Sequence, residues 1–90
     1  MWIVLVHDFY FMQNHHIHIG QLIQETLREK GISASWLAKK IYCHPTNMYK
    51  IFQKKYIDTE LLEAISLALD TDFFSCYSET LLRQAEKKKE

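Results

Sequence analysis

The sequence predicts an all-α protein of five short helices in a single domain. The chain has 90 residues, of which 48% are hydrophobic, yet it contains only two glycines and one proline. Such a composition leaves few residues for the tight turns of a hairpin-rich β fold. Apolar residues instead recur at helical spacing, and the breaks between these segments are about two to five residues long, as in a small helix bundle.

The first predicted helix covers about residues 19–30. Ile19, Leu22 and Ile23 are spaced so that they share one helix face, and Leu27 continues this apolar stripe. Gly31 follows as a natural C-terminal stop.

The next two helices are expected to be short and closely connected. Ser33 can cap the first of them, which ends near Tyr42. Pro45 fits the first position of the second, over residues 45–53. Because so few residues join them, the two helices must cross at a steep angle, the arrangement of a helix-turn-helix. The side chains expected to face inward are Trp36, Leu37, Ala38 and Ile41 on the first helix and Met48, Ile51 and Phe52 on the second.

Two more helices complete the expected domain, which covers residues 18–82. Asp58 or Thr59 caps a helix that runs to about residue 69, and the last helix begins near Phe73. Residues 83–90 form a charged tail. Residues 1–17 form an apolar extension that is a strand or disordered; a strand would need a partner, such as the same segment of a second subunit. Alternatively, the natural protein starts at Met12, and both possibilities remain open.

Charge is unevenly distributed along a chain whose formal net charge is zero. Residues 31–57 contain five lysines and no Asp or Glu, whereas residues 58–82 contain six acidic residues and no Lys or Arg. A basic middle segment can approach a polyanion while the acidic segment faces away or contacts another protein. The pattern favours nucleic acid as a partner, although accidental clustering on a solvated surface would also produce it.

Residues 18–74 read HIGQLIQETLREKGISASWLAKKIYCHPTNMYKIFQKKYIDTELLEAISLALDTDFF. Over roughly residues 18–78 the chain resembles the Cro/repressor-type helix-turn-helix proteins of the xenobiotic-response-element (XRE) family. It is most similar to small bacterial regulators that read LAKKL…TNVYKIF…IDTELLLRIS…LDYDFF. The family's "LA" pair falls on Leu37 and Ala38, and the apolar pair of its recognition helix falls on Met48 and Ile51. The resemblance implies a lambda-repressor-like bundle that binds double-stranded DNA.

Three residues depart from the family pattern. Tyr42 stands in the turn where the family often has a glycine with positive φ, so either Tyr42 is left-handed or the turn is built differently. Ala34 replaces a polar residue, often a glutamine that contacts phosphate, and Phe52 stands where a polar group is common.

The resemblance and the residue types together indicate a DNA-binding surface. In a helix-turn-helix, the start of the second helix reaches base edges, and the groups around it hold phosphates. Asn47 can pair with adenine, the Thr46 methyl group can touch a thymine methyl group, and Lys50 suits a guanine edge or a phosphate. The candidate DNA-binding residues are Ser33, Ser35, Lys39, Pro45, Thr46, Asn47, Tyr49, Lys50, Lys54 and Lys55.

We expect a repressor-like transcription regulator in the bacterial cytoplasm, associated with the nucleoid. A homodimer through the last helix, with or without the N-terminal extension, is expected because one short helix reads too few base pairs for specificity. The alternative is a protein-interaction or antitoxin-like module with little or no DNA binding. Zero net charge, Ala34 and Tyr42 favour this alternative, and the lack of acidic residues over 31–57 disfavours it.

Other functions find little support in the sequence. Cys43 and Cys76 are too few for a disulfide framework and are expected to be reduced thiols. The cluster of His15, His16 and His18 lacks a nearby carboxylate or cysteine that would complete a metal site. No catalytic triad, pair of acids in an apolar context or glycine-rich phosphate loop suggests an enzyme. We expect no cofactor, metal or small-molecule ligand, and no membrane partner because no apolar run reaches about 18 residues.

Overall fold

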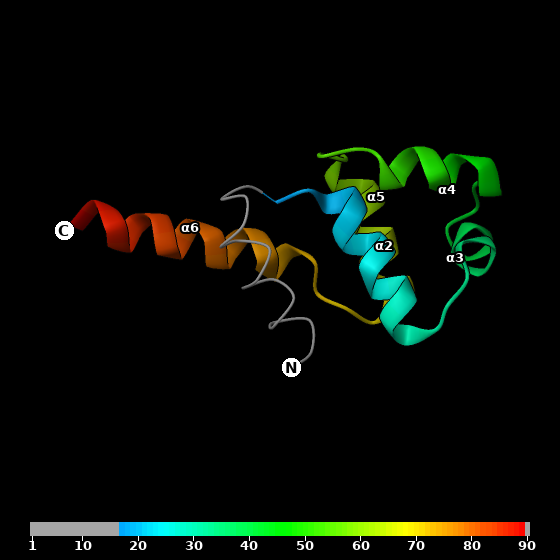
Figure 1. The fold of residues 1–90 in the computed structure, drawn as a ribbon, viewed down its shortest axis with the longest axis horizontal. Coiled ribbons are helices and arrows are strands. Elements are labelled where there is room, and N and C mark those ends of the chain that lie inside the picture. Colours follow the sequence, from blue (N-terminus) through cyan, green and yellow to red (C-terminus); the bar gives the residue numbers. More distant parts are fainter. Residues whose placement is uncertain (1–16, 90) are drawn as a thin grey trace. The chain divides into compact units, whose positions relative to one another are not determined.

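The computed structural model of the protein describes residues 17–89, and over this range it contains five helices and no strand. The helices, in the order shown in Figure 1, are α2 (Ile19–Lys30), α3 (Ala34–Lys40), α4 (Pro45–Phe52), α5 (Thr59–Leu69) and α6 (Phe74–Lys89). The predicted all-α, five-helix fold is confirmed. The apolar extension falls almost entirely on residues 1–16, which lie outside the described residues.

The chain divides into two compact units. Residues 18–71 form one unit, which contains α2 to α5, and α6 belongs to the other. The start of α6 is capped by Asp72, whose Oδ1 accepts hydrogen bonds from the N–H groups of Phe74 (3.0 Å) and Ser75 (3.2 Å). The helix continues through residues 83–89, the segment expected to form a charged tail.

Cys43 and Cys76 are both free thiols, as predicted. Cys76 is buried on α6. Its burial and the nearby carboxylates of Glu79 and Asp72 raise the pKa of its thiol to about 12. The Cys76 thiol is therefore protonated and unreactive at neutral pH.

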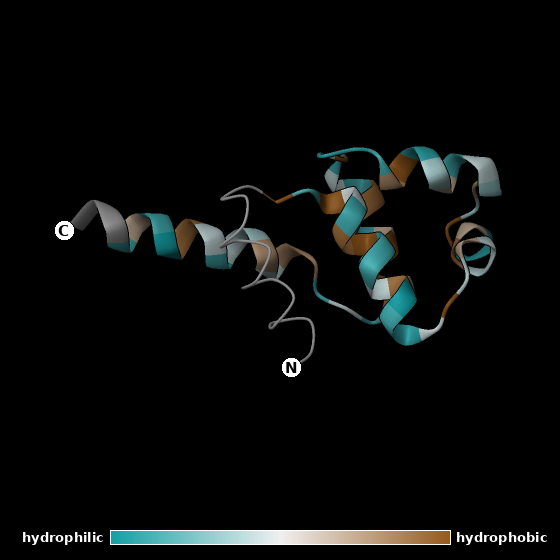
Figure 2. Ribbon diagram, viewed as in Figure 1, coloured by the Kyte–Doolittle hydropathy of each residue, from teal (hydrophilic) through white to brown (hydrophobic). Residues whose placement is uncertain are grey.

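The core of the unit over residues 18–71 is formed by one face of each helix. α3 packs against α4 and α5, and α2 packs against α4. Figure 2 shows hydrophobic and hydrophilic residues alternating along these helices, as expected when one face is buried. The inward positions predicted for α2 and α4 are all buried, which confirms the helical periodicity; they are Ile19, Leu22, Ile23, Leu27, Met48, Ile51 and Phe52.

The prediction that Trp36 faces the core is wrong. Its side chain is 40% exposed, and the Lys40 ammonium lies 5.2 Å from the centre of its ring. Consecutive residues on a helix are about 100° apart, so three in a row cannot all face the core. Leu37 and Ala38 are fully buried and form the inward face of α3.

Three of these helices end in the same way, with one residue in the left-handed conformation. That residue is Gly31 after α2 (φ 68°), Tyr42 after α3 (φ 58°) and Asp70 after α5 (φ 51°). After α3, the Tyr42 N–H donates to the Lys39 carbonyl and the Cys43 N–H donates to the Ala38 carbonyl at 2.9 Å. Equivalent pairs of hydrogen bonds follow α2 and α5. This is the Schellman motif, so Tyr42 takes the conformation in which the family often has glycine.

Gly20 lies where the first turn of α2 meets the end of α4. The Gly20 N–H donates to the Lys54 carbonyl at 2.9 Å, and the Ile19 N–H donates to the Lys55 carbonyl at 3.1 Å. A Cβ atom on Gly20 would lie 2.3 Å from the Ile51 carbonyl oxygen and 2.5 Å from that of Phe52. Only glycine allows the backbones of α2 and α4 to approach this closely.

Gly20→Ala is expected to destabilise the protein by about 3 kcal/mol, because the added methyl group meets backbone atoms that cannot rotate away. The measurement is urea unfolding followed by circular dichroism. Gly31→Ala is the matched control, because its Cβ would meet nothing within 4 Å. Only the left-handed backbone conformation disfavours alanine there, and we expect a loss of stability of about 1 kcal/mol. Equal losses in the two variants would contradict the close approach at Gly20.

Tyr42→Gly is expected to stabilise the protein by about 1 kcal/mol, because a left-handed conformation costs an L-residue about 1–2 kcal/mol and costs glycine little. The Tyr42 side chain is 96% exposed, so its removal loses little packing. Thermal unfolding of the two proteins measures the difference. Asp70→Gly should gain less, because aspartate tolerates this conformation better than tyrosine; a lower melting temperature for Tyr42→Gly would refute the assignment.

Candidate nucleic-acid interface

The first N–H groups of α4 donate hydrogen bonds to the residue that precedes the helix. His44 precedes the helix, and its Nδ1 accepts a hydrogen bond from the Thr46 N–H at 3.1 Å. The His44 carbonyl accepts from the Asn47 N–H at 2.8 Å. Pro45 occupies the first helical position, where its lack of an N–H carries no penalty. The sequence therefore begins α4 at the position predicted from Pro45.

The exposed face of α4 carries the polar residues of the candidate site. Met48, Ile51 and Phe52 are buried and hold the helix against the rest of the unit. This fixes the opposite face toward solvent, where the exposed residues of α4 are Pro45, Thr46, Asn47, Tyr49 and Lys50. The Tyr49 ring packs edge-on against Phe52, with ring centres 5.9 Å apart, so it also shields a core side chain.

Lys54 and Lys55 follow α4 in the loop that contacts α2. Their carbonyl groups accept the hydrogen bonds from Gly20 and Ile19, while their side chains are exposed. The Lys55 ammonium lies 5.6 Å from the centre of the Tyr56 ring. The loop backbone is thus fixed, and its two charges remain available to solvent.

The remaining candidates lie on or just before α3. Ser33 caps this helix, and its Oγ accepts a hydrogen bond from the Trp36 N–H at 3.0 Å. The Ser33 side chain therefore has a structural role, although its hydroxyl hydrogen can still be donated. Ser33, Ser35 and Lys39 are exposed, so all ten candidate residues lie on the surface.

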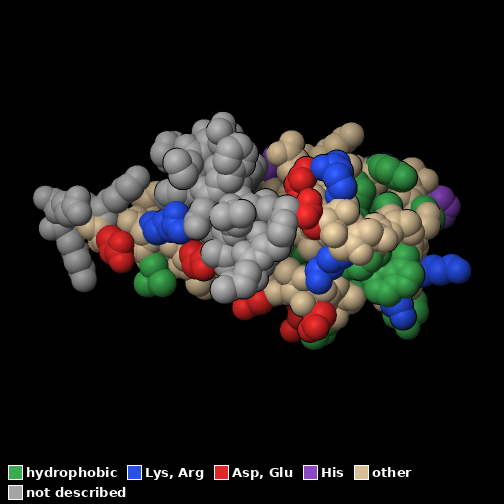
Figure 3. Space-filling model, turned by 60° about the horizontal axis from the view of Figure 1, so that its bottom comes forward, with side chains coloured by type: hydrophobic (Ala, Val, Ile, Leu, Met, Phe, Trp, Pro, Cys, Tyr) green, Lys and Arg blue, Asp and Glu red, His purple; other side chains and the backbone are tan. Residues whose placement is uncertain are grey.

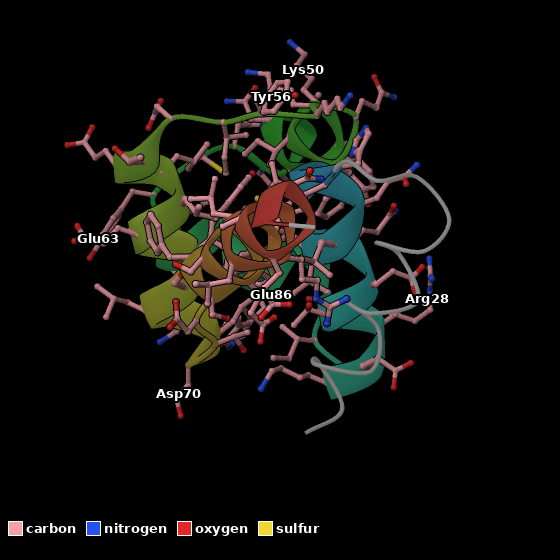
Figure 4. All side chains as sticks on the ribbon, turned by 90° about the vertical axis from the view of Figure 1, so that its left-hand side faces the viewer. Arg28, Lys50, Tyr56, Glu63, Asp70 and Glu86 are labelled. Atoms are coloured by element: carbon pink, nitrogen blue, oxygen red, sulfur yellow. The ribbon has the colours of Figure 1, made fainter. Side chains whose placement is uncertain are left out.

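One end of the unit of residues 18–71 differs in charge from the rest, where Lys or Arg and Asp or Glu side chains lie beside one another. In Figure 3 the end formed by α3 and α4 shows hydrophobic, Lys or Arg and His side chains, with no Asp or Glu on the face in view. In Figure 4 Lys50 and Tyr56 lie at one end of this unit and Asp70 lies at the opposite end. An anion approaching α4 therefore meets lysines before it meets a carboxylate.

A half-buried thiol supports the turn between α3 and α4. Cys43 Sγ lies 3.7 Å from the thioether sulfur of Met48 and can donate a weak hydrogen bond to it. Burial raises the pKa of the Cys43 thiol. It remains protonated at neutral pH and packs as a small apolar group under the turn.

Two residues of this surface are not among the ten predicted candidates. His44 caps α4, although histidine is not among the common capping residues. The signal that could have found it is its position directly before the proline that starts the helix. Tyr56 is exposed beside Lys55, and no periodic pattern marks this residue because it lies in a loop.

Within residues 17–89, no group of three or more His, Cys, Asp or Glu side chains is placed to hold a metal ion. Of the three histidines considered as ligands, His18 caps α2, with its Nδ1 accepting from the Gln21 N–H at 3.1 Å; the other two lie outside this range. None of the described helices combines the length and the apolar character needed to cross a membrane.

The comparisons with known proteins agree with this geometry. A family model described as the Cro/C1-type HTH DNA-binding domain matches residues 22–73, which cover α3 to α5 and most of α2. Comparisons with curated proteins and with solved structures found no significant match. The matched segment is more than half of the chain and contains the tight α3–α4 connection, so the protein belongs to the family of Cro/C1-type helix-turn-helix DNA-binding domains.

Proposed function

We propose that the protein regulates transcription by placing α4 in the major groove of a specific DNA sequence. The observation that carries this proposal is the division of α4 into a buried apolar face and an exposed polar face. A major groove about 12 Å wide admits one α-helix, whose outward side chains then reach base edges. The absence of acidic residues from positions 31–57 supports an approach to phosphates.

The side chains of α4 take different roles in this proposal. Asn47 reads an adenine through its amide, and Thr46 contacts a thymine methyl group or a phosphate. Lys50 reaches a guanine edge or a phosphate from the next turn. Lys54 and Lys55 hold the backbone of the DNA, because their carbonyl groups are fixed to α2 and their ammonium groups are exposed. Ser33, Ser35 and Lys39 add weaker phosphate contacts from α3.

The proposed regulator is a repressor-like homodimer that acts in the bacterial cytoplasm. Leu81 and Leu82 on α6 are 70% and 65% exposed, and Phe74 is 37% exposed. Burying such side chains between two copies would stabilise a dimer. Two α4 helices would then read half-sites one helical turn apart, which gives the specificity that one short helix lacks. Occupying a promoter in this way blocks transcription without a further activity.

An interaction module that has kept this scaffold without binding DNA is the second candidate. The formal net charge of zero favours it, because most DNA affinity comes from neutralising phosphates. Ala34 also favours it, since its methyl group offers no hydrogen bond at the start of α3. The dependence of DNA binding on salt separates the two candidates.

Replacing Lys50 and Lys54 together by alanine is expected to weaken binding to random-sequence duplex DNA by about tenfold or more at physiological salt. With each lost phosphate contact, one fewer counterion is released when the protein binds DNA. The magnitude of the slope of log K against log salt should therefore fall by about 2. Fluorescence anisotropy across a salt series measures both quantities.

The control for this pair removes two positive charges elsewhere. Arg28→Ala with Lys30→Ala changes the net charge by the same amount in the last turn of α2, outside the proposed surface. This control should keep the wild-type slope. Wild-type binding without salt dependence, or equal binding by the Lys50/Lys54 variant, would exclude the DNA-binding role.

Leu81→Ser with Leu82→Ser is expected to convert the dimer to a monomer, because these two leucines are the most exposed large apolar side chains described on α6. Sedimentation velocity measures the mass, and circular dichroism checks that the helices remain. Leu67→Ser is the matched control, since Leu67 is 76% exposed but lies on α5. A wild-type protein that sediments as a monomer at all concentrations would rule out the dimer.

A further inference from the structure

The start of α4 offers no backbone donor from its first three residues to an anion. Pro45 has no N–H, the Thr46 N–H is used by His44 Nδ1, and the Asn47 N–H is used by the His44 carbonyl. Phosphate binding at a helix N-terminus normally depends on such N–H groups being free. In this protein a phosphate near the start of α4 therefore needs a side-chain donor.

The hydrogen bond from Thr46 determines which nitrogen of His44 carries the proton. Nδ1 accepts the bond, so it has no hydrogen, and the neutral ring must carry its hydrogen on Nε2. His44 is exposed, so this Nε2–H is open to solvent. The same bond polarises the ring from the positive end of the helix, which strengthens Nε2–H as a donor.

We propose that His44 donates its Nε2–H to a DNA phosphate at the N-terminus of α4 and so positions this helix in the groove. The inference rests on the proposed DNA-binding function and assigns a residue outside the ten candidates. His44 directly precedes Pro45, Thr46 and Asn47. Its contact with a phosphate therefore fixes how deeply the side chains that read bases enter the groove. Phosphate contacts of this kind set register, and base contacts supply sequence preference.

His18 provides an internal comparison, because it caps α2 through the same Nδ1 bond. The next two N–H groups of α2, on Ile19 and Gly20, donate to the carbonyls of Lys55 and Lys54. The N-terminus of α2 is therefore packed against the protein's own backbone. His18 thus caps a helix end that packs against protein, whereas His44 caps a helix end that is exposed to solvent.

The test separates the cap from the phosphate contact with two substitutions. His44→Asn keeps an acceptor near the Nδ1 position and loses the distant donor, since asparagine is shorter and is itself a good cap. His44→Gln places an amide N–H near the Nε2 position and gives up most of the cap. His18→Asn makes the cap-preserving change on α2. Binding is measured by fluorescence anisotropy with random-sequence duplex DNA of about 20 base pairs, long enough for two half-sites.

His44→Asn is expected to keep the wild-type melting temperature and to bind DNA about fivefold more weakly, the usual effect of one lost hydrogen bond. Its salt slope should stay at the wild-type value, because a neutral donor releases no counterion. His44→Gln should melt at a lower temperature yet bind more tightly than His44→Asn. His18→Asn should match the wild type in both measurements.

Two binding results would overturn the inference, and they are distinguishable. If the wild type binds DNA with a salt-dependent affinity and His44→Asn binds equally well, His44 makes no phosphate contact and the proposed function stands. If the wild type does not bind DNA at all, the proposed function fails and this inference fails with it. Nitrogen-15 spectra of the His44 ring give a second readout: the Nε2–H signal should shift on addition of the duplex, and an unchanged signal contradicts the contact.

Discussion

The contact of Gly20 with the end of α4 fixes the helix that carries the candidate site. Two N–H groups at the start of α2 donate to the carbonyls of Lys54 and Lys55, in the loop that follows α4. The missing side chain at Gly20 lets the α2 backbone reach the carbonyls of Ile51 and Phe52. The C-terminal end of α4 therefore cannot rotate or slide without breaking these bonds. With this end held and Met48, Ile51 and Phe52 buried, the polar face of α4 points outward.

The opposite end of α4 is fixed by the turn from α3. In the Schellman motif after α3, the Cys43 N–H donates to the Ala38 carbonyl. This bond reverses the direction of the chain shortly before α4 begins. Tyr42 accepts the left-handed conformation that this motif needs, at some loss of stability. Its side chain makes no compensating contact in the core, since it is almost fully exposed. The geometry of the α3–α4 pair is thus maintained by hydrogen bonds and by the packing of Leu37, Ala38 and Met48 beneath it.

The helices and most of the core could be predicted from local patterns, because each pattern reports one helix face or one helix end. Gly31 and Pro45 mark boundaries through backbone conformations that do not depend on the rest of the chain. Trp36 was misplaced because the pattern on a short helix does not say which of three successive apolar residues faces outward. Gly20 and His44 were missed because their roles depend on atoms of other segments or on an uncommon cap. The exposure of the candidates on α3 and α4 follows from the helical pattern, whereas the contacts of all ten candidates with DNA remain predictions.

The zero net charge of the chain is compatible with DNA binding because charges act over short distances at physiological salt. Screening limits the reach of exposed charges to about 8 Å. Asp70 lies at the opposite end of the unit from Lys50, so it has little influence on a phosphate beside α4. A protein built in this way gains little long-range steering toward DNA, because distant attraction and repulsion cancel. Its affinity must then depend more on placed hydrogen bonds than that of a strongly basic binder. The rigid attachment of both ends of α4 provides that placement.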